Sequence, residues 1–218
     1  MDILNSLKSR VANTSGTSGT TPASTSTTPA AVAPAVVRAP APTPTASTKP
    51  TVVEIDSFIT DSQGFNHGEQ VAKTINANND INVIKMDISS GDGYANVSNA
   101  LDQVLARLKN GEHIDAVNLS QQAYVENAQA AEIRAKLDQI AAMGVPVDVA
   151  AGNDGPNKTN VLVSAHSFSV ASTTNGVVNA SSGKGNVNAE ASTTSFAAAE
   201  FTRQIALLHA AGKAIAIP

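Results

Sequence analysis

The sequence predicts a three-layer α/β fold, in which a mostly parallel sheet lies between helices. Short apolar runs alternate along the chain with longer segments whose apolar residues recur every three or four positions. The first pattern is typical of strands buried on both faces and the second of amphipathic helices. Their alternation indicates βαβ units, which give parallel strands with right-handed crossovers. Aromatic residues make up only 3% of the chain, so the predicted core consists of Ala, Val, Ile and Leu.

The first predicted strand, residues 51–55, places Asp56 at its carboxyl end. After a polar turn, a helix opens with His67-Gly68. The inner face of this helix is predicted to be Val71, Ala72 and Ile75. In an open α/β sheet, reacting groups collect beyond the carboxyl ends of the strands. An acid at a strand end and a histidine at the next helix start are therefore well placed to meet.

Three further strands and two helices follow in alternation. The strands are predicted over residues 81–88, 114–119 and 145–150. One helix follows a turn at residues 89–93, and its inner face is predicted to be Val97, Leu101, Val104, Leu105 and Leu108. The next helix has the inner face Ile133, Leu137, Ile140 and Ala141. Glycines at the expected ends, Gly111 and Gly144, are typical helix stops.

Beyond residue 150 the pattern is shorter and less regular. Short strands are predicted over residues 161–165, 168–171 and 176–180, the last as a hairpin arm. The final helix, residues 196–211, carries no charge except Glu200 and Arg203, with Gly212 as its stop. Such an apolar helix is expected to be buried on most sides.

Residues 1–50 are predicted to form a disordered leader or linker, and residues 51–218 one folded domain. The leader is rich in Thr, Ser, Ala, Pro and Gly, and it buries too little apolar surface to offset the entropy of ordering. A tether to a partner and a removable leader both fit this composition. Ile3, Leu4, Leu7 and Val11 could form one side of a short helix, but a frayed terminus is the preferred interpretation. The first residues lack the apolar core of a signal peptide, and the compartment is not indicated.

The composition argues against several classes of partner and cofactor. The formal charge of −4 argues against nucleic-acid or anionic-membrane binding, and no stretch approaches the roughly 20 apolar residues of a membrane span. The chain has no Cys, which excludes disulfides and thiolate chemistry. No cofactor and no metal site are predicted. The polar loop at residues 76–82 is a candidate for calcium, but it lacks an ordered series of carboxylates. The oligomeric state is not indicated.

Four polar residues have ordinary explanations when each is taken alone. Asp56 suits a turn, and a single histidine such as His67 is most often structural. Asn153 lies in Ala150-Ala-Gly-Asn-Asp-Gly155, whose residue types favour turns. Ser195 lies where the last helix begins, and serine is a common N-cap.

Together, three of these residues follow the order Asp, His, Ser, which is one of the known chain orders of a nucleophilic triad. In such a triad the serine attacks a carbonyl carbon and the histidine takes and returns its proton. The aspartate holds the imidazole tautomer. An asparagine amide, such as that of Asn153, can donate to the oxyanion that develops.

At these positions the sequence resembles the subtilisin-like serine proteases (subtilases, peptidase family S8). The matching blocks, in order, are Ile55-Asp-Ser, His67-Gly-Glu-Gln-Val-Ala, Gly91-Asp-Gly-Tyr94 with Ala116-Val-Asn-Leu-Ser120, Val149-Ala-Ala-Gly-Asn-Asp-Gly155 and Thr194-Ser-Phe-Ala-Ala198. The resemblance implies a subtilisin-like fold from Thr51 to about Gly212 and a peptide or protein substrate.

The resemblance also implies roles for individual residues. It makes Asp56, His67 and Ser195 the triad, with His67 within hydrogen-bond reach of both partners, and Asn153 the oxyanion donor. The residues implied to line the substrate groove are Ser120, Gly91, Gly93 and Tyr94. Ordinary loop packing explains these groove residues equally well.

The chain also departs from the family pattern at several positions. Phe58 and Thr193 replace glycines, Gln121-Gln122 replaces Leu-Gly, and only eleven residues separate Asp56 from His67. The leading hypothesis is a compact serine endopeptidase. A catalytically impaired domain that binds peptides or acts as a scaffold remains the alternative. A nucleotide-binding module is a distant third, because the chain has Asn96 where the third glycine of a phosphate loop belongs.

Overall fold

A computed structural model describes residues 49–218 of the chain. The candidate helix near the amino terminus and nearly all of the predicted leader lie outside the described residues. The described strands are β1 (Thr51–Asp56), β2 (Asn82–Asp87), β3 (Ala116–Leu119), β4 (Val147–Ala150), β5 (Phe168–Thr174), β6 (Val177–Val178) and β7 (Val187–Glu190). The described helices are α2 (His67–Ile75), α3 (Gly93–Lys109), α4 (Ala128–Ala142) and α5 (Thr194–Ala210).

The strands form one seven-stranded sheet in the order β2-β1-β3-β4-β5-β6, and β7 also pairs with β5. Every pairing is parallel except that between β5 and the two-residue β6. The predicted mostly parallel sheet is therefore confirmed. Because the parallel strands run the same way, their carboxyl ends share one edge of the sheet.

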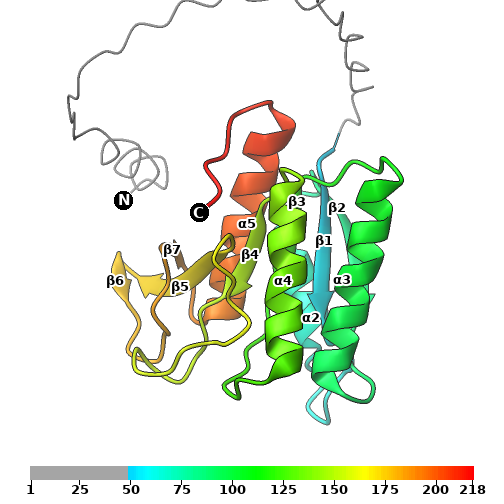
Figure 1. The fold of residues 1–218 in the computed structure, drawn as a ribbon. Coiled ribbons are helices and arrows are strands. Elements are labelled where there is room, and N and C mark those ends of the chain that lie inside the picture. Colours follow the sequence, from blue (N-terminus) through cyan, green and yellow to red (C-terminus); the bar gives the residue numbers. More distant parts are fainter. Residues whose placement is uncertain (1–48) are drawn as a thin grey trace, which may run out of the picture.

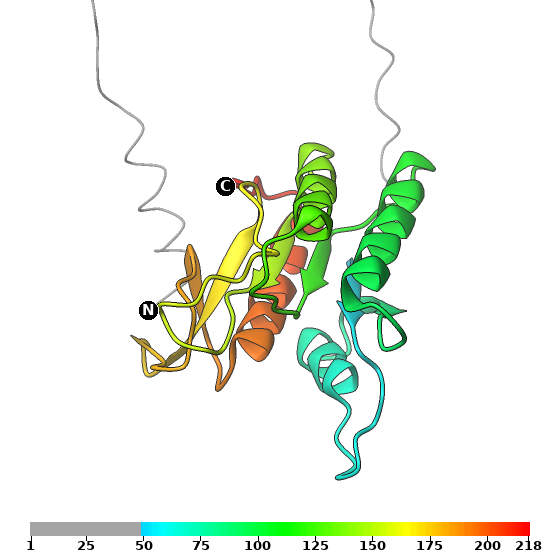
Figure 2. The same cartoon turned by 60° about the horizontal axis from the view of Figure 1, so that its bottom comes forward.

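The helices cover both faces of the sheet and complete the predicted three layers (Figure 1). Helices α3 and α4 lie side by side on one face, and α2 and α5 lie on the other (Figure 2). The larger core cluster, beneath α3 and α4, includes Leu101, Ile133 and Leu137, each of them fully buried. Two smaller clusters, which include Phe201 and Ile75, pack α5 and α2 against the other face.

Local sequence signals account for where the helices begin and end. The side chains of Asn66, Asp92 and Asn127 accept hydrogen bonds from the backbone at the starts of α2, α3 and α4. Such caps satisfy N–H groups that have no partner within the helix. The three glycines predicted as helix stops, Gly111, Gly144 and Gly212, have φ values of 81°, 86° and 69°. This left-handed backbone suits glycine and ends a helix.

The predicted strand at residues 161–165 is wrong, because this segment is a loop. The buried side chain of Asn160 forms hydrogen bonds with backbone groups around this loop, where a strand would form them with a neighbouring strand. Its Oδ1 accepts from the backbone N–H groups of Ala123 and Leu162, and its Nδ2 donates to the carbonyls of Gln121 and Ala150. All four of its hydrogen-bonding positions are used, so the apolar residues that follow pack against the core without pairing in the sheet.

Two further differences concern the ends of elements. Strand β7 (residues 187–190) is not among the predicted strands, and the last helix begins at Thr194 rather than at residue 196. None of the described helices has the length and apolar character needed to cross a membrane.

Candidate active site

The end of β1 brings the first two candidate residues into contact. Asp56 is fully buried, and its two carboxylate oxygens each lie 2.9 Å from Nδ1 of His67. Oδ1 of Asp56 also accepts from the backbone N–H of Ser57 at 2.6 Å and from Nε2 of Gln121 at 2.7 Å. The buried carboxylate is thus solvated by protein donors in place of water.

His67 is half-buried at the start of α2. The hydrogen bond with Asp56 raises the pKa of the imidazole above its usual value, although burial opposes this shift. A carboxylate only accepts hydrogen bonds, so Nδ1 carries a proton and the neutral ring presents Nε2 as its unprotonated nitrogen. In this state His67 is a base whose free nitrogen points away from Asp56.

Phe58 does not line the cavity next to the acid. Its ring lies against Gly68, where a Cβ atom would come within 2.8 Å of two ring carbons, and Nζ of Lys85 lies 5.6 Å from the ring centroid. The bulky ring in place of a family glycine therefore packs beneath the start of α2. Gly68 allows this packing because it has no side chain.

Ser195 lies in the first turn of α5 and is only 7% exposed. Its hydroxyl donates to the backbone carbonyl of Ser120 at 3.4 Å. The predicted hydrogen bond between His67 and Ser195 is not formed among the described residues. The two residues are nevertheless neighbours, because the ring of Phe196 lies 6.0 Å from the ring of His67, centroid to centroid.

Asn153, in the loop after β4, links that loop to the start of α5. Its Oδ1 accepts from the backbone N–H of Thr194 at 2.9 Å and from the Thr194 hydroxyl at 3.0 Å. These bonds orient the amide and leave Nδ2 as its donor group. Nδ2 lies 3.3 Å from Oε1 of Gln122, which also accepts from the Asn153 backbone N–H at 2.8 Å.

A cavity of about 340 Å³ joins these residues at the carboxyl edge of the sheet. It is lined by Asp56, Ser57, His67, Ser120, Gln121, Gln122, Ala150, Asn153 and Ser195. Gly91, Gly93 and Tyr94, predicted to line a substrate groove, lie at the start of α3 and are not among the residues that line this cavity. The Tyr94 hydroxyl donates to the carbonyl of Val125 at 2.9 Å, which fixes the segment after Ser120 to α3.

A chain of buried polar side chains contacts the backbone of Ser195. Ser120 donates to Oδ1 of Asn118 at 2.8 Å and lies 3.1 Å from the carbonyl of Ser195. Nδ2 of Asn118 donates to the Thr202 hydroxyl at 3.0 Å. Thr202 lies about two turns after Ser195 in α5. Sequence reasoning did not identify Asn118 or Thr202, although an asparagine inside the apolar run at residues 116–119 is a signal for a buried polar contact.

Two buried carboxyl groups lie in the sheet on either side of Asn118. Glu54 on β1 and Asp148 on β4 both pair with Asn118 of β3 in the sheet register, so they flank it on one face. Both are fully buried, and none of their carboxyl oxygens has a hydrogen-bond partner. Burial raises the pKa of Glu54 to about 9 and that of Asp148 to about 8, so both groups are protonated at neutral pH.

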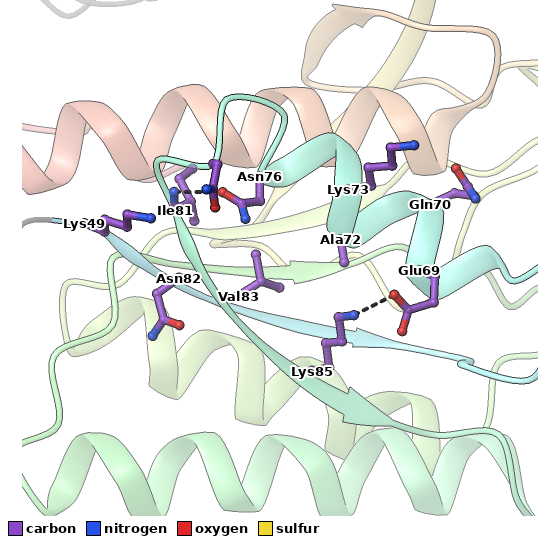
Figure 3. Close-up of a pocket in the computed structure, with 11 residues that line it drawn as sticks. Lys49, Glu69, Gln70, Ala72, Lys73, Asn76, Ile81, Asn82, Val83 and Lys85 are labelled. Carbon is purple, nitrogen blue, oxygen red and sulfur yellow. Dashed lines mark hydrogen bonds and ion pairs between the residues drawn. The ribbon is translucent and has the colours of Figure 1, made fainter.

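A second, larger hollow contains none of the candidate catalytic residues. It has a volume of about 680 Å³ and lies between α2 and the edge strand β2 (Figure 3). Lys73, Lys85 and Glu69 line it, and Lys85 pairs with Glu69 at 2.7 Å. No group of three or more His, Asp or Glu side chains in residues 49–218 is arranged to hold a metal ion.

No family model matches the sequence, and no curated protein matches it significantly. Solved structures do match the fold. A lanthipeptide protease is 17% identical with a TM-score of 0.59, covering 73% of this chain and 72% of that one. The prenylagaramide maturation protease PagA is 17% identical with a TM-score of 0.59, covering 77% and 79%. A cold-adapted subtilisin-like serine proteinase is 16% identical with a TM-score of 0.58, covering 77% and 78%. The chain therefore has the fold of the subtilisin-like proteases.

Proposed function

We propose that this protein is a serine endopeptidase in which Asp56, His67 and Ser195 form the triad. The observation that carries the proposal is the shared cavity. One hollow of about 340 Å³ is lined by an Asp–His pair, by a serine at a helix start and by an asparagine amide. These are the groups that acyl transfer requires, and they come from four separate parts of the chain.

In the proposed reaction Ser195 first turns its hydroxyl from the Ser120 carbonyl towards Nε2 of His67. The long bond of 3.4 Å to Ser120 is a weak restraint on this rotation. Ser195 Oγ then forms a bond to the carbonyl carbon of the substrate while its proton passes to His67. Asp56 stabilises the resulting imidazolium through Nδ1. The proton goes to the leaving amine as the C–N bond breaks. Water then attacks the acyl carbon while His67 takes its proton, and that proton returns to Ser195 Oγ as the acyl bond breaks.

The oxyanion of the tetrahedral intermediate would be held by two donors. One is Nδ2 of Asn153, whose orientation is fixed by the bonds of Oδ1 to Thr194. The other is the backbone N–H of Ser195, because N–H groups in the first turn of a helix have no partner within the helix. The positive end of the α5 dipole favours the same negative charge.

A peptide substrate is supported by the names of the similar structures. They include a lanthipeptide protease and a prenylagaramide maturation protease. Both are named as proteases, and the first is named for a lanthipeptide. We extend only the chemical class, a peptide or protein substrate, to this chain.

The alternative function is a domain that binds peptides without cleaving them. Two observations favour it: Ser195 is bonded to Ser120 instead of His67, and Gln122 already accepts from the oxyanion donor Asn153. The contact of Ser195 must break before catalysis, and the contact of Gln122 occupies one of the two N–H groups on Nδ2 of Asn153. A non-catalytic domain would bind peptides in the same cavity but would not react with them.

Labelling with a fluorophosphonate probe distinguishes the two functions. An active triad is expected to label the full chain at Ser195, and Ser195→Ala is expected to lose both the label and the cleavage of a broad fluorogenic peptide library. Asn153→Asp keeps the acceptor for Thr194 but loses the donor, and we expect turnover to fall by roughly 10²–10³. If wild type and Ser195→Ala give the same background rate and neither is labelled, the peptidase proposal is wrong.

A further inference from the structure

Gln121 is the second side chain that donates to the candidate catalytic acid. Its Nε2 lies 2.7 Å from Oδ1 of Asp56, closer than His67 Nδ1 at 2.9 Å. Oδ1 also accepts from the Ser57 backbone, whereas His67 alone among the described residues donates to Oδ2. Gln121 therefore occupies one oxygen of the carboxylate and leaves the other to the imidazole.

The backbone of Gln121 is held rigidly at the end of β3. Its carbonyl accepts from Nδ2 of Asn160 at 2.9 Å, and the same amide donates to the carbonyl of Ala150 at 2.7 Å. Asn160 is only 2% exposed and also binds the backbone N–H of Ala123. The amide of Gln121 thus reaches Asp56 from a fixed anchor, as a positioning group must.

A carboxylate can rotate about its last side-chain bond, and a second fixed donor restricts that rotation. An amide does not titrate, so this donor persists at every pH at which a peptidase works. We propose that Gln121 is a positioning residue. It fixes the plane of the Asp56 carboxylate, so that Nδ1 of His67 meets the carboxylate in one orientation. This inference rests on the proposed peptidase function and adds a residue that lies outside the triad.

The contact has a consequence for His67 that can be measured without any substrate. Gln121 draws negative charge on Asp56 towards itself, which weakens the attraction between the carboxylate and a protonated imidazole. Asp56 is the charged group in contact with His67, and the rings of Phe65 and Phe196 that also border it are uncharged. Removing the donor is therefore expected to raise the pKa of His67.

The test uses Gln121→Leu, which keeps most of the bulk and removes the donor. Gln103→Leu on the exposed face of α3 is the control, because it makes the same substitution away from Asp56. The readouts on the full chain are the titration of the His67 ring protons by NMR and the separate values of kcat and KM for a fluorogenic peptide. For Gln121→Leu we expect kcat to fall about tenfold, as for one lost bond to a charged group, with little change in KM.

In the NMR titration we expect the pKa of His67 to rise in Gln121→Leu, while Gln103→Leu matches wild type. If Gln121→Leu matches wild type in both the titration and kcat, the positioning role is wrong even though the peptidase stands. If wild type is inactive and Ser195 is not labelled, the peptidase proposal fails. The His67 titration then still decides whether Gln121 acts on the Asp56–His67 pair.

Discussion

At the scale of single residues, the two glutamines after Ser120 distinguish this site. Gln121 donates to Asp56, and Gln122 accepts from both the backbone and the side chain of Asn153. The side-chain oxygen of Gln122 therefore lies beside the amide that we propose as the oxyanion donor. In the proposed peptidase, Gln121 supports the acid and Gln122 competes with the substrate for Asn153.

Gln122→Ala is expected to raise kcat/KM by roughly three- to tenfold, because the substrate no longer displaces an amide hydrogen bond worth about 0.5–1.5 kcal/mol. Gln122→Glu is the matched comparison, since a carboxylate is a stronger acceptor and should lower kcat/KM. Cleavage of one fluorogenic peptide by the three proteins gives the order. A Gln122→Ala protein that is slower than wild type, at unchanged thermal stability, would contradict the competing role.

The pH dependence of the rate follows from the Asp56–His67 contact. The contact raises the pKa of His67, so the free base that accepts the serine proton appears only above the usual histidine value of about 6.5. We expect kcat/KM to rise with pH through a midpoint above that value. Asp56→Asn should move the midpoint down as well as lower the plateau. A pH–rate profile that is flat from pH 6 to 9 would argue against His67 as the base.

At the scale of elements, one asparagine determines the form of the segment after β4. Asn160 binds four backbone groups and joins three pieces of chain: the end of β4, the segment after β3 and its own loop. The apolar residues at 161–163 consequently pack against the core without becoming a strand. The same bonds hold the backbone of Gln121, so the loop and the site depend on one side chain.

Asn160→Ala is expected to lower the free energy of unfolding by about 2–4 kcal/mol, since it leaves buried carbonyls and N–H groups without partners. Asn160→Asp keeps the two acceptor contacts and loses the two donor contacts, so it separates the two halves of the effect. Urea unfolding of wild type and both variants measures the loss. A change below about 0.5 kcal/mol in both would show that water replaces these bonds.

At the scale of the whole molecule, the two buried carboxyl groups tie stability to pH. The pKa of Glu54 is raised from 4.5 to about 9, and that of Asp148 from 3.8 to about 8. At a pH between its unfolded and folded pKa values, each carboxyl group keeps its proton in the folded state and releases it in the unfolded state. Stability therefore falls as pH rises through this window, by at most about 1.4 kcal/mol per pH unit for each group.

Glu54→Gln and Asp148→Asn are each expected to flatten this decline, because an amide keeps the shape of the protonated acid without an ionisable proton. Both variants should melt at a higher temperature than wild type at pH 9. The melting temperature, measured from pH 5 to pH 9, tests this expectation. Equal slopes for wild type and the double variant would mean that the carboxyl groups ionise in the folded protein at little cost.

The sequence by itself determined the architecture and the candidates for the chemistry. Strand and helix periods are local patterns, so β1 to β4, the helix faces and their glycine stops were predictable from neighbouring residues. The order of Asp56, His67 and Ser195 and the blocks around them indicated the subtilisin-like fold, which the similar structures confirm.

Only the tertiary structure decided how these residues meet. The contacts of Gln121 with Asp56 and of Gln122 with Asn153 span 65 and 31 positions. The loop at Asn160 and the unpaired carboxyl groups of Glu54 and Asp148 likewise depend on which strands lie side by side. Hydrogen-bond partners and burial are properties of distant chain segments brought together. A local pattern specifies the helix or strand that carries a side chain, whereas the packing of the whole sheet determines the hydrogen-bond partners of that side chain.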